Sequence, residues 1–547
     1  MVTPSPERLR TPSKSCHSER RFLGARNLLL LEANKNRFLS SFRVTNSFAL
    51  HNVVLDFVLK QNLMKIISFL VLAASLSLPV AAIAGTAAEI QQQSQQVAGS
   101  ILVGGHAMDT LQTLTDTFGP RMTGSPNYNR AVAWAVEQFR SYGIKDVKLE
   151  PFTMANGWER GPVRASMVTP FQHPLHLEAF GWSPSTPPGG TRGELLLLKD
   201  ITPDGIKAQS GAMKGKIVLL DRNSLFKDRS PKNFELLEAS PARLAKAGAL
   251  AAILVGNIPN NVISTGDLGW GGELGPLVMA ATGMEDGRML MRWLEKGPVS
   301  VEFEYQNKST GPIEENDVVA EIRGSEKPEE WILIGAHLDS WDFATGAQDN
   351  GAGTAQVLEA ARAIAALGKP PKRSIRFALW GGEEEGLVGS IAYGRQHSAE
   401  MAKCVAVLNT DNGAGHPKGW KVQGRKDVEA ALEPLSKSLL AQLGGAEISE
   451  ELSFDTDHGP FMLYGVPALD LLVDDGDYDV VHHKQADTLD KVDVHDLASG
   501  AAVVAVTGLA LANAEQPFAA HLDHAAEGEI LKKDGLDQYL KAQGLWK

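Results

Sequence analysis

The sequence predicts an α/β fold: a mixed, largely parallel sheet sandwiched by helices, with a smaller α+β module inserted in the chain. Two observations lead to this prediction. From residue 316 to 515, strand-like runs alternate with helix-like runs, the order that builds a largely parallel sheet. From about 155 to 310, short β-like runs are separated by Gly/Pro turns, which indicates a separate module.

Composition excludes several classes of protein. Hydrophobic residues make up 43% and charged residues 22% of the 547 residues, which excludes collagen, low-complexity fibres and full disorder. At roughly 100–200 residues per domain, the length suggests two to four domains. The net charge of −12 would repel phosphate backbones, so no nucleic acid is expected as a partner. The two cysteines, Cys16 and Cys404, provide no disulfide framework.

Residues 64–84 have the pattern of a secretory signal peptide. Met64-Lys65 is a short basic start, Ile66–Leu78 is apolar, and the small residues up to Ala84 supply an A-x-A cleavage site. The apolar core is shorter than the roughly 20 residues that a membrane span needs. The residue directly after Ala84 is Gly85 and not a cysteine, so no lipoprotein-type membrane anchor is expected. We expect cleavage near Ala84 and export to the periplasm or the medium.

Residues 1–63 do not fit a mature exported protein. The first 84 residues hold 11 Lys and Arg against 4 Asp and Glu, so the acidic excess of the chain lies entirely after them. Residues 1–63 are also rich in Ser and Asn and show no sustained hydrophobic period. We interpret them as a non-native upstream extension, with translation starting at Met64. An organelle-targeting leader is the alternative.

The remaining elements follow in order along the chain. Residues 85–154 are expected to open the large domain with helices at 86–115 and Asn127–Tyr142, the second ended by Gly143, and a strand at Val147–Phe152. In 155–310 the expected strands are Gly193–Leu198, Lys216–Asp221, Ala249–Val255 and Val301–Tyr305, with helices at Ala242–Gly248 and Met284–Leu294.

The large domain is expected to resume at 311–515. Its strands are predicted at Val318–Ile322, Trp331–Ala336, Ser374–Trp380, Val405–Thr410 and Ala468–Val473, and its helices at Ala352–Leu367, Leu387–Gln396, Val428–Leu443 and Val494–Ala512. Residues 516–547 are predicted to form a polar, mostly helical tail. Cys404, at the start of a predicted strand, is expected to be buried and inert.

Side chains that bind metals follow the predicted strands. In open α/β sheets, ligands bind at the carboxyl ends of the strands. These positions hold His337 and Asp339, then Asp349 in the next loop, the run Glu383–Glu385, Asp411, and finally the pair His482 and His483. Each motif alone is more often an ordinary strand end or turn. Their joint occurrence in chain order predicts a site for Zn²⁺ or a similar divalent ion.

The residue set suits two metal ions. Two cations roughly 3.5–4 Å apart repel each other and need several carboxylates to hold them. With Asp349 bridging, each ion needs about two further ligands. His337 and Asp339 are two residues apart and point to the same side, so Asp339 can accept a hydrogen bond from the imidazole. Glu383 and Glu384 can divide their roles, one binding metal and the other facing the attacking water.

At this point the sequence resembles the co-catalytic di-zinc exopeptidases, a group that includes leucyl aminopeptidases and carboxypeptidase Q-like enzymes. The runs that carry the resemblance are Gly335–Ser340, Gly346–Gly353, Glu383–Ser390, Asn409–Asp411 and His483–Thr488. The resemblance implies one ion on His337, Asp349 and Asp411, a second ion on Asp349, Glu384 and His483, and Glu383 as general base, with Asp339 supporting the catalytic set. The family spacing from His to Thr488 selects His483 over His482.

The inserted module has its own resemblance. Gly215–Leu220, Ala245–Val255 and Pro276–Met279 are similar to the protease-associated domain, which larger members of the family carry at this place. The implied role is partial cover of the active-site mouth. By the same resemblance, Asp457 or His458 is expected near the substrate pocket.

We therefore expect a zinc-dependent exopeptidase with two Zn²⁺ per chain that hydrolyses short peptides from a free N-terminus, as an aminopeptidase or dipeptidase. The acidic loop Asp474–Asp479 is either solvated, a holder of the substrate amine, or a calcium site. Two other functions stay open: a zinc amidohydrolase of N-acyl amino acids, and a catalytically silent binding protein of the transferrin-receptor type. A homodimer is expected only by resemblance.

Overall fold

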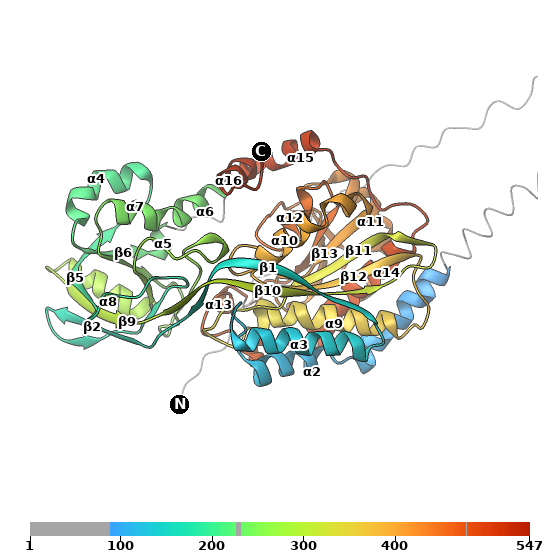
Figure 1. Cartoon of the computed structure of the whole chain (residues 1–547), viewed down its shortest axis with the longest axis horizontal. Helices are drawn as coiled ribbons and strands as arrows, with labels where there is room; N and C mark the ends of the chain where they lie inside the picture. Colours follow the sequence, from blue (N-terminus) through green and yellow to red (C-terminus); the bar gives the residue numbers. More distant parts are fainter. Residues whose placement is uncertain (1–87, 226–230, 477) are drawn as a thin grey trace, which may run out of the picture. The chain divides into compact units, whose positions relative to one another are not determined.

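The computed structural model describes residues 88–225, 231–476 and 478–547 (Figure 1). The predicted upstream extension, 1–63, and signal peptide, 64–84, lie outside the described residues. The described chain contains two mixed eight-stranded sheets with helices packed on them. This confirms the predicted α/β class.

The first sheet has the strand order β1-β10-β12-β11-β13-β16-β14-β15. Its strands are β1 (Asp146–Glu159), β10 (Lys308–Ile322), β11 (Lys327–His337), β12 (Arg373–Trp380), β13 (Cys404–Asn409), β14 (Pro417–Lys421), β15 (Glu447–Ser449) and β16 (Ala468–Val473). The four central strands, β12, β11, β13 and β16, are parallel; β10 and β14 flank them antiparallel, and β1 pairs antiparallel with β10. The carboxyl ends of the central strands therefore meet at one edge.

Helices cover both faces of this sheet. The helices α3 (Pro126–Ser141), α9 (Ala352–Ala365) and α14 (Val494–Asn513) pack on one face, and α10 (Val388–Gln396) and α12 (Gly459–Met462) pack on the other (Figure 1). Along β11, Ile332 belongs to the first core and Leu333 to the second. Alternate side chains of a strand point to opposite faces, and both faces are covered here, which explains the continuous apolar run Ile332–Ala336 of β11. Each fully buried large apolar side chain stabilises the fold by about 1.5–3 kcal/mol.

The helix α14 also has the length and hydropathy of a membrane span, and it is the one helix among the described residues with both properties. It packs against α9 and the sheet, and most of its side chains are buried. Its apolar composition is therefore explained by its place in the core.

The second sheet is built from residues 163–305, with the order β3-β2-β9-β5-β6-β7-β8-β4. Its strands are β2 (Val163–Thr169), β3 (His173–Pro174), β4 (Leu177–Ala179), β5 (Thr191–Leu198), β6 (Ile217–Asp221), β7 (Ala251–Val255), β8 (Met279–Thr282) and β9 (Ser300–Tyr305). The strands β5 to β8 are parallel. The helices of this module are α4 (Pro203–Met213), α5 (Arg222–Leu225), α6 (Pro231–Glu238), α7 (Ser240–Lys246) and α8 (Met284–Leu294).

Two strands of the first sheet are longer than predicted. The strands β1 and β10 pair antiparallel from Asp146 opposite Glu321 to Glu159 opposite Lys308, with irregular register near Gly157. The prediction ended the first strand at Phe152 and began the second at Val318. Residues 308–317 are polar and include Gly and Pro, so they carry little strand signal of their own. Pairing with the partner strand holds them extended (Figure 1).

The helix predicted over 86–115 is wrong as a single element. Residues 88–104 are helical, but α2 (Ala107–Gln112) starts anew and ends in a π-helical turn, Thr113–Phe118. The break lies at Gly105, where a Cβ would lie 2.2 Å from the carbonyl oxygen of Ile101. The backbone N–H of His106 instead donates to Glu359 of α9 at 3.2 Å. A tertiary contact therefore interrupts an amphipathic pattern that looks continuous.

The remaining predicted helices differ only near their ends. The predicted helix at 428–443 is α11 (Lys426–Ser438) followed by a 3₁₀ turn, Leu440–Leu443. The tail forms α15 (His524–Leu531), a 3₁₀ turn (Lys532–Asp534) and α16 (Leu536–Ala542). Other short elements are Trp270–Gly272, Ala347–Gly351, Ser398–Lys403, α13 (Tyr478–Val481) and Leu489–Lys491.

Cys404 is buried, as expected, and its burial raises the pKa of the thiol.

Candidate active site

The seven predicted site residues lie together at the carboxyl edge of the first sheet. They are His337 at the end of β11, Asp339 just after it, Asp349 in the turn Ala347–Gly351, Glu383 and Glu384 after β12, Asp411 after β13, and His483 after α13. Because the central strands are parallel, their last residues share this edge. The structure thus brings together all the residues that the motifs had singled out.

Asp349 occupies the centre of the site. Its Oδ1 lies 3.3 Å from Nε2 of His337, which in turn lies 3.1 Å from Oδ1 of Asp411. Its Oδ2 lies 3.4 Å from Nε2 of His483, which lies 3.0 Å from Oε2 of Glu384. The two oxygens of one carboxylate therefore face two different groups of side chains.

Asp339 contacts the side of the His337 ring that faces away from Asp349. Its Oδ1 lies 3.4 Å from Nδ1 of His337, the ring nitrogen that faces away from Asp349. Its Oδ2 accepts hydrogen bonds from Oγ1 of Thr123 at 3.0 Å and from the backbone N–H of Glu384 at 3.4 Å. Asp339 is fully buried, so these contacts fix it. It can hold the imidazole of His337 in one orientation.

Glu383 stands at the opening of the site. Its Oε2 lies 3.9 Å from Nε2 of His337, and its side chain retains 10% of its exposure, against 1% for Glu384. Adjacent glutamates on one turn thus have different surroundings. Glu384 points into the buried cluster, and Glu383 borders the space that a substrate or water can reach.

The turn that carries Asp349 is tied down by side chains from other elements. The carboxylate of Asp487 accepts the backbone N–H groups of Gln348 at 2.7 Å and of Asp349 at 3.1 Å. The side chain of Asn350 donates to the carbonyl oxygen of Thr410 at 2.9 Å. The prediction gave Asp487 no role. The sequence feature that could have indicated this role is the place of Asp487 four residues after His483. The loop that carries His483 also holds the turn that carries Asp349.

Arg121 is a second supporting residue that the sequence did not reveal. Its guanidinium is fully buried and donates to the carbonyl oxygens of Leu338, Thr345 and Gly346 at 2.8–2.9 Å, and to that of Gly119 at 3.0 Å. These bonds hold the loop between β11 and Asp349. Burial lowers the pKa of Arg121 to about 10. From the sequence, Arg121 could be identified only as the last residue of a predicted turn, because no local pattern distinguishes a buried arginine from an exposed one.

Burial and neighbouring charges shift the pKa values of the site residues in different directions. Burial raises the pKa of Glu383 and of Glu384, and neighbouring carboxylates raise both further. Burial would also raise the pKa of Asp349, but its contacts with the histidines outweigh this and lower it. Burial would lower the pKa of His337, but Asp411 and Glu383 outweigh this and raise it. Crowded, buried carboxylates of this kind need positive charge among them.

The donor set fits divalent cations. Oδ2 of Asp349 and both side-chain oxygens of Glu384 are buried, and no donor in the described part of the chain makes a hydrogen bond to them. His483 approaches Glu384 to 3.0 Å without the alignment of a hydrogen bond, as two ligands do when they converge on an ion. Ligand atoms of His337, Asp349 and Asp411 lie within 4.8 Å of one another. Imidazole nitrogens with carboxylate oxygens are ligands that Zn²⁺ accepts.

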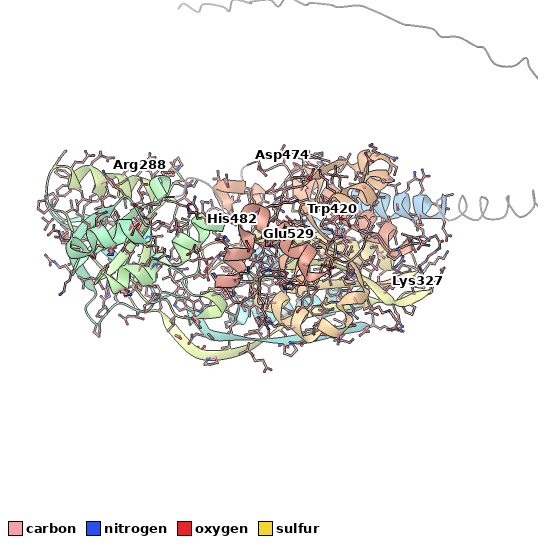
Figure 2. All side chains as sticks on the ribbon, turned by 90° about the horizontal axis from the view of Figure 1, so that it is seen from above. Arg288, Lys327, Trp420, Asp474, His482 and Glu529 are labelled. Carbon is pink, nitrogen blue, oxygen red and sulfur yellow. The ribbon has the colours of Figure 1, made fainter. Side chains whose placement is uncertain are left out.

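His482 lies closer to the site than its motif suggested. Its Nε2 is 3.8 Å from Oδ2 of Asp349, and Asp349, His482 and His483 form a second group able to hold an ion. Its ring stacks on that of His483, with centroids 3.9 Å apart, and on Tyr478 at 5.1 Å. Figure 2 labels His482. Both histidines of the pair therefore border Asp349, and only His483 also reaches Glu384.

This difference predicts unequal effects of two substitutions. His483→Ala is expected to cost the site a bound metal ion, because it removes a nitrogen that faces both Asp349 and Glu384. His482→Ala is expected to weaken zinc binding by about 10- to 100-fold at most, as loss of a supporting contact does. Zinc titration of both variants, with metal counted by mass spectrometry, checks this. Loss of an ion from the His482 variant alone would reverse the assignment.

The other residues singled out in the sequence lie around this cluster. Asp457 is buried, and burial together with nearby carboxylates raises its pKa to about 8. His458 contacts the carbonyl oxygen of Ser453 at 3.2 Å, which suits a structural role. In the acidic loop, Asp474, Asp475 and Asp479 are exposed.

Comparison with known proteins agrees with this geometry. The profile of peptidase family M28 matches residues 317–508. Human carboxypeptidase Q is 31% identical over 413 residues, which cover 75% of this chain and 85% of that protein. The structure of the peptidase M28 precursor of Shewanella amazonensis SB2B is 30% identical, with a TM-score of 0.72, over 79% of this chain and 99% of that chain. A zinc aminopeptidase of Bacillus subtilis, 23% identical over 74% of this chain and 93% of that chain, shares the fold with a TM-score of 0.58.

Proposed function

The chain belongs to peptidase family M28 and is a metallo-exopeptidase, and from that premise we propose that it removes residues from the free N-terminus of short peptides with two zinc ions. The observation that carries the proposal is Asp349, whose two oxygens face two separate groups of histidine and carboxylate side chains. A carboxylate in this position can bridge two cations.

The two proposed ion sites divide the cluster. His337, Asp349 and Asp411 would hold one ion, and Asp349, Glu384 and His483 the other. When bound, the ions would supply Lewis acidity, which polarises the scissile carbonyl and makes water a nucleophile near neutral pH. The distances between the donor atoms support this division, because each group is compact and the two share only Asp349.

Glu383 is the proposed general base. It would take a proton from the attacking water and deliver it to the nitrogen of the leaving amine, so it must reach both. Its position at the opening supports this role, since the neighbouring Glu384 is directed into the cluster. Asp339 would keep the Nε2 of His337 directed at Asp349 and Asp411 by holding Nδ1.

The substrate class rests on the relatives. One is named carboxypeptidase Q, and a Mycobacterium tuberculosis relative, 28% identical, is named a probable lipoprotein aminopeptidase. We propose aminopeptidase or dipeptidase action, export of the enzyme after cleavage near Ala84, and a homodimer. The module of the second sheet, residues 155–310, is proposed to be a protease-associated domain inserted between residues 85–154 and 311–515 of the peptidase domain, with 516–547 as its tail.

Metal removal tests the proposal. A chain starting at Gly85 is expected to cleave a free dipeptide and an aminoacyl arylamide, to lose both activities on chelation, and to regain them when two zinc ions per chain are restored. An N-acetylated dipeptide serves as the control and is expected to resist cleavage. Cleavage of the acetylated substrate alone would favour the amidohydrolase. Binding of no metal, with no cleavage, would favour a silent binding protein.

A further inference from the structure

The loop that carries His483 is paired with a segment of the second-sheet module, residues 263–265. The backbone N–H of Thr265 donates to the carbonyl oxygen of His483 at 2.9 Å, and that of Gln485 donates to the carbonyl oxygen of Ile263 at 3.2 Å. In Figure 1 the helix α13, which leads into this loop, lies at the end of the first-sheet domain that faces the module. The module therefore contributes hydrogen bonds to the backbone around a proposed metal ligand.

The backbone of His483 has a conformation that needs such support. Its φ is 56°, in the left-handed region that residues other than glycine adopt rarely. Such a conformation persists where the surrounding structure holds it. Directly after His483, Lys484 forms an antiparallel bridge with Ser264 of the module. Because the backbone sets the direction of the side chain, this pairing helps to aim Nε2 of His483 at Asp349 and Glu384, which lie 3.4 and 3.0 Å away.

The imidazole of His483 is also bordered by an indole that the module confines. The ring of Trp341 meets that of His483 edge-on, with centroids 5.9 Å apart, and meets that of Trp182 in the module at 6.2 Å. Trp341 is only 5% exposed. A Cβ at Gly181 of the module would lie 2.5 Å from the Trp341 ring, so the module packs tightly against this indole. Edge-on contacts of this kind favour one relative orientation of two rings.

Arg160 joins the two contacts. Its guanidinium forms a two-pronged ion pair with Asp342, the residue after Trp341, at 2.7 and 2.9 Å. Its Nη2 also donates to Oγ1 of Thr265 at 3.4 Å, and its side chain is only 9% exposed. Two parallel bonds between a guanidinium and a carboxylate are strong and geometrically specific. The loop of Trp341 and the segment that pairs with His483 are therefore fixed to each other.

The ligands proposed for the other ion are held by the first-sheet domain itself. The carbonyl oxygen of His337 accepts a hydrogen bond from the hydroxyl of Thr354 in α9 at 2.7 Å. The imidazole of His337 lies 3.4 Å from Asp339 and 3.1 Å from Asp411. All these residues belong to 311–515. The two proposed ion sites therefore differ in what holds their ligands.

We propose that the module is part of the site for one zinc ion, with residues 263–265 and Trp341 as positioning residues that hold His483 in its ligand orientation. This inference rests on the proposed two-zinc function. Loss of a group that orients a metal ligand reduces metal affinity by about 10- to 100-fold. Loosening the contact with the module should therefore weaken the ion that uses His483 and spare the ion on His337 and Asp411.

Thr265→Pro tests the backbone contact, because proline lacks the N–H that donates to His483. The preceding residue, Ser264, lies in a β-bridge, which suits the extended backbone that proline requires before it. The variant is expected to bind one zinc ion about 10- to 100-fold more weakly and the other with unchanged affinity. Zinc titration in competition with a chelator, with metal counted by mass spectrometry, measures both ions.

Thr265→Ala is the matched control. It also loses the hydroxyl but keeps the N–H, and it is expected to bind both ions with nearly wild-type affinity. The contact of the hydroxyl with Arg160 is long, at 3.4 Å, and so the weaker of the two that Thr265 makes.

Two substitutions of Trp341 test the ring contact. Trp341→Leu removes the aromatic edge that meets His483 and is expected to weaken the same single ion. Trp341→Phe keeps an aromatic edge and should restore part of the affinity. His483→Ala is the reference: adding Thr265→Pro to it should weaken zinc binding no further, because two changes that act through one residue are not additive.

Two results would overturn this inference while leaving the proposed function intact. The first is wild-type affinity for both ions in Thr265→Pro and Trp341→Leu. The second is an equal loss of affinity for both ions, which would show that the module supports the whole fold and not His483 in particular. If Thr265→Pro does not fold, the two variants of Trp341 decide between these results and the expected one. A wild type that binds fewer than two zinc ions would instead overturn the two-zinc function, and this inference with it.

Discussion

Glu383→Gln is expected to lower kcat by about 10²- to 10⁴-fold, the usual contribution of a general base, while two zinc ions stay bound. The substitution keeps the size of the side chain and removes its ability to take a proton. Zinc should remain because the ligand role is assigned to Glu384, whose carboxylate lies 3.0 Å from His483, and not to Glu383. Steady-state kinetics and metal counting on the same preparation check both parts.

The control for this variant is Glu273→Gln, because Glu273 is an exposed glutamate that follows the short turn Trp270–Gly272. It is expected to turn over at the wild-type rate, since it lies outside the buried cluster. Near-wild-type turnover of Glu383→Gln would show that another group accepts the proton. Loss of zinc from that variant would show that Glu383 is a ligand and that the roles of the two glutamates need to be exchanged.

Asp349→Ala is expected to abolish activity and to remove both zinc ions. One oxygen of Asp349 faces His337 and the other faces His483, so its loss takes a ligand from each proposed ion. It also leaves the other carboxylates without the bridge that keeps two cations close. Because an ion that binds only the folded state stabilises it by mass action, the melting temperature of this variant should no longer respond to added zinc.

Asp475→Asn is the matched control, because Asp475 is an exposed carboxylate of the acidic loop. It is expected to bind two zinc ions and to show the wild-type response of the melting temperature. If Asp349→Ala retained one ion with unchanged affinity, Asp349 would belong to a single site. The bridging arrangement, and with it the division of the cluster into two sites, would then be wrong.

Much of the fold was readable from local sequence patterns. The strand at Trp331–Ala336 was predicted from its continuous apolar run, and the structure explains the run because both faces of this strand are buried. The helix Met284–Leu294 was predicted with its observed bounds. The extensions of β1 and β10 and the break at Gly105 were missed, because a paired strand and a buried carboxylate on a distant helix decide them.

The residues of the candidate site were also predicted from the sequence. Their types and their places after successive strands are local properties, and the parallel order of the strands then requires that they meet at one edge. That reasoning reached His337, Asp349, Asp411, the glutamate run 383–385 and the pair His482 and His483, and the family resemblance then selected Glu384 and His483 as ligands.

Only the tertiary structure decided which side chains hold the loops of this cluster in place and which segment of the second-sheet module pairs with them. Asp487 and Arg121 fix its loops through bonds to backbone groups that lie far away in the sequence or on other elements. Residues 263–265 of the second-sheet module pair with the loop of His483, although more than 200 residues separate the two segments. The physical reason is that residue type and spacing act locally. Which distant segment a loop pairs with depends on how the two sheets are connected in the folded chain, and no local sequence pattern indicates this.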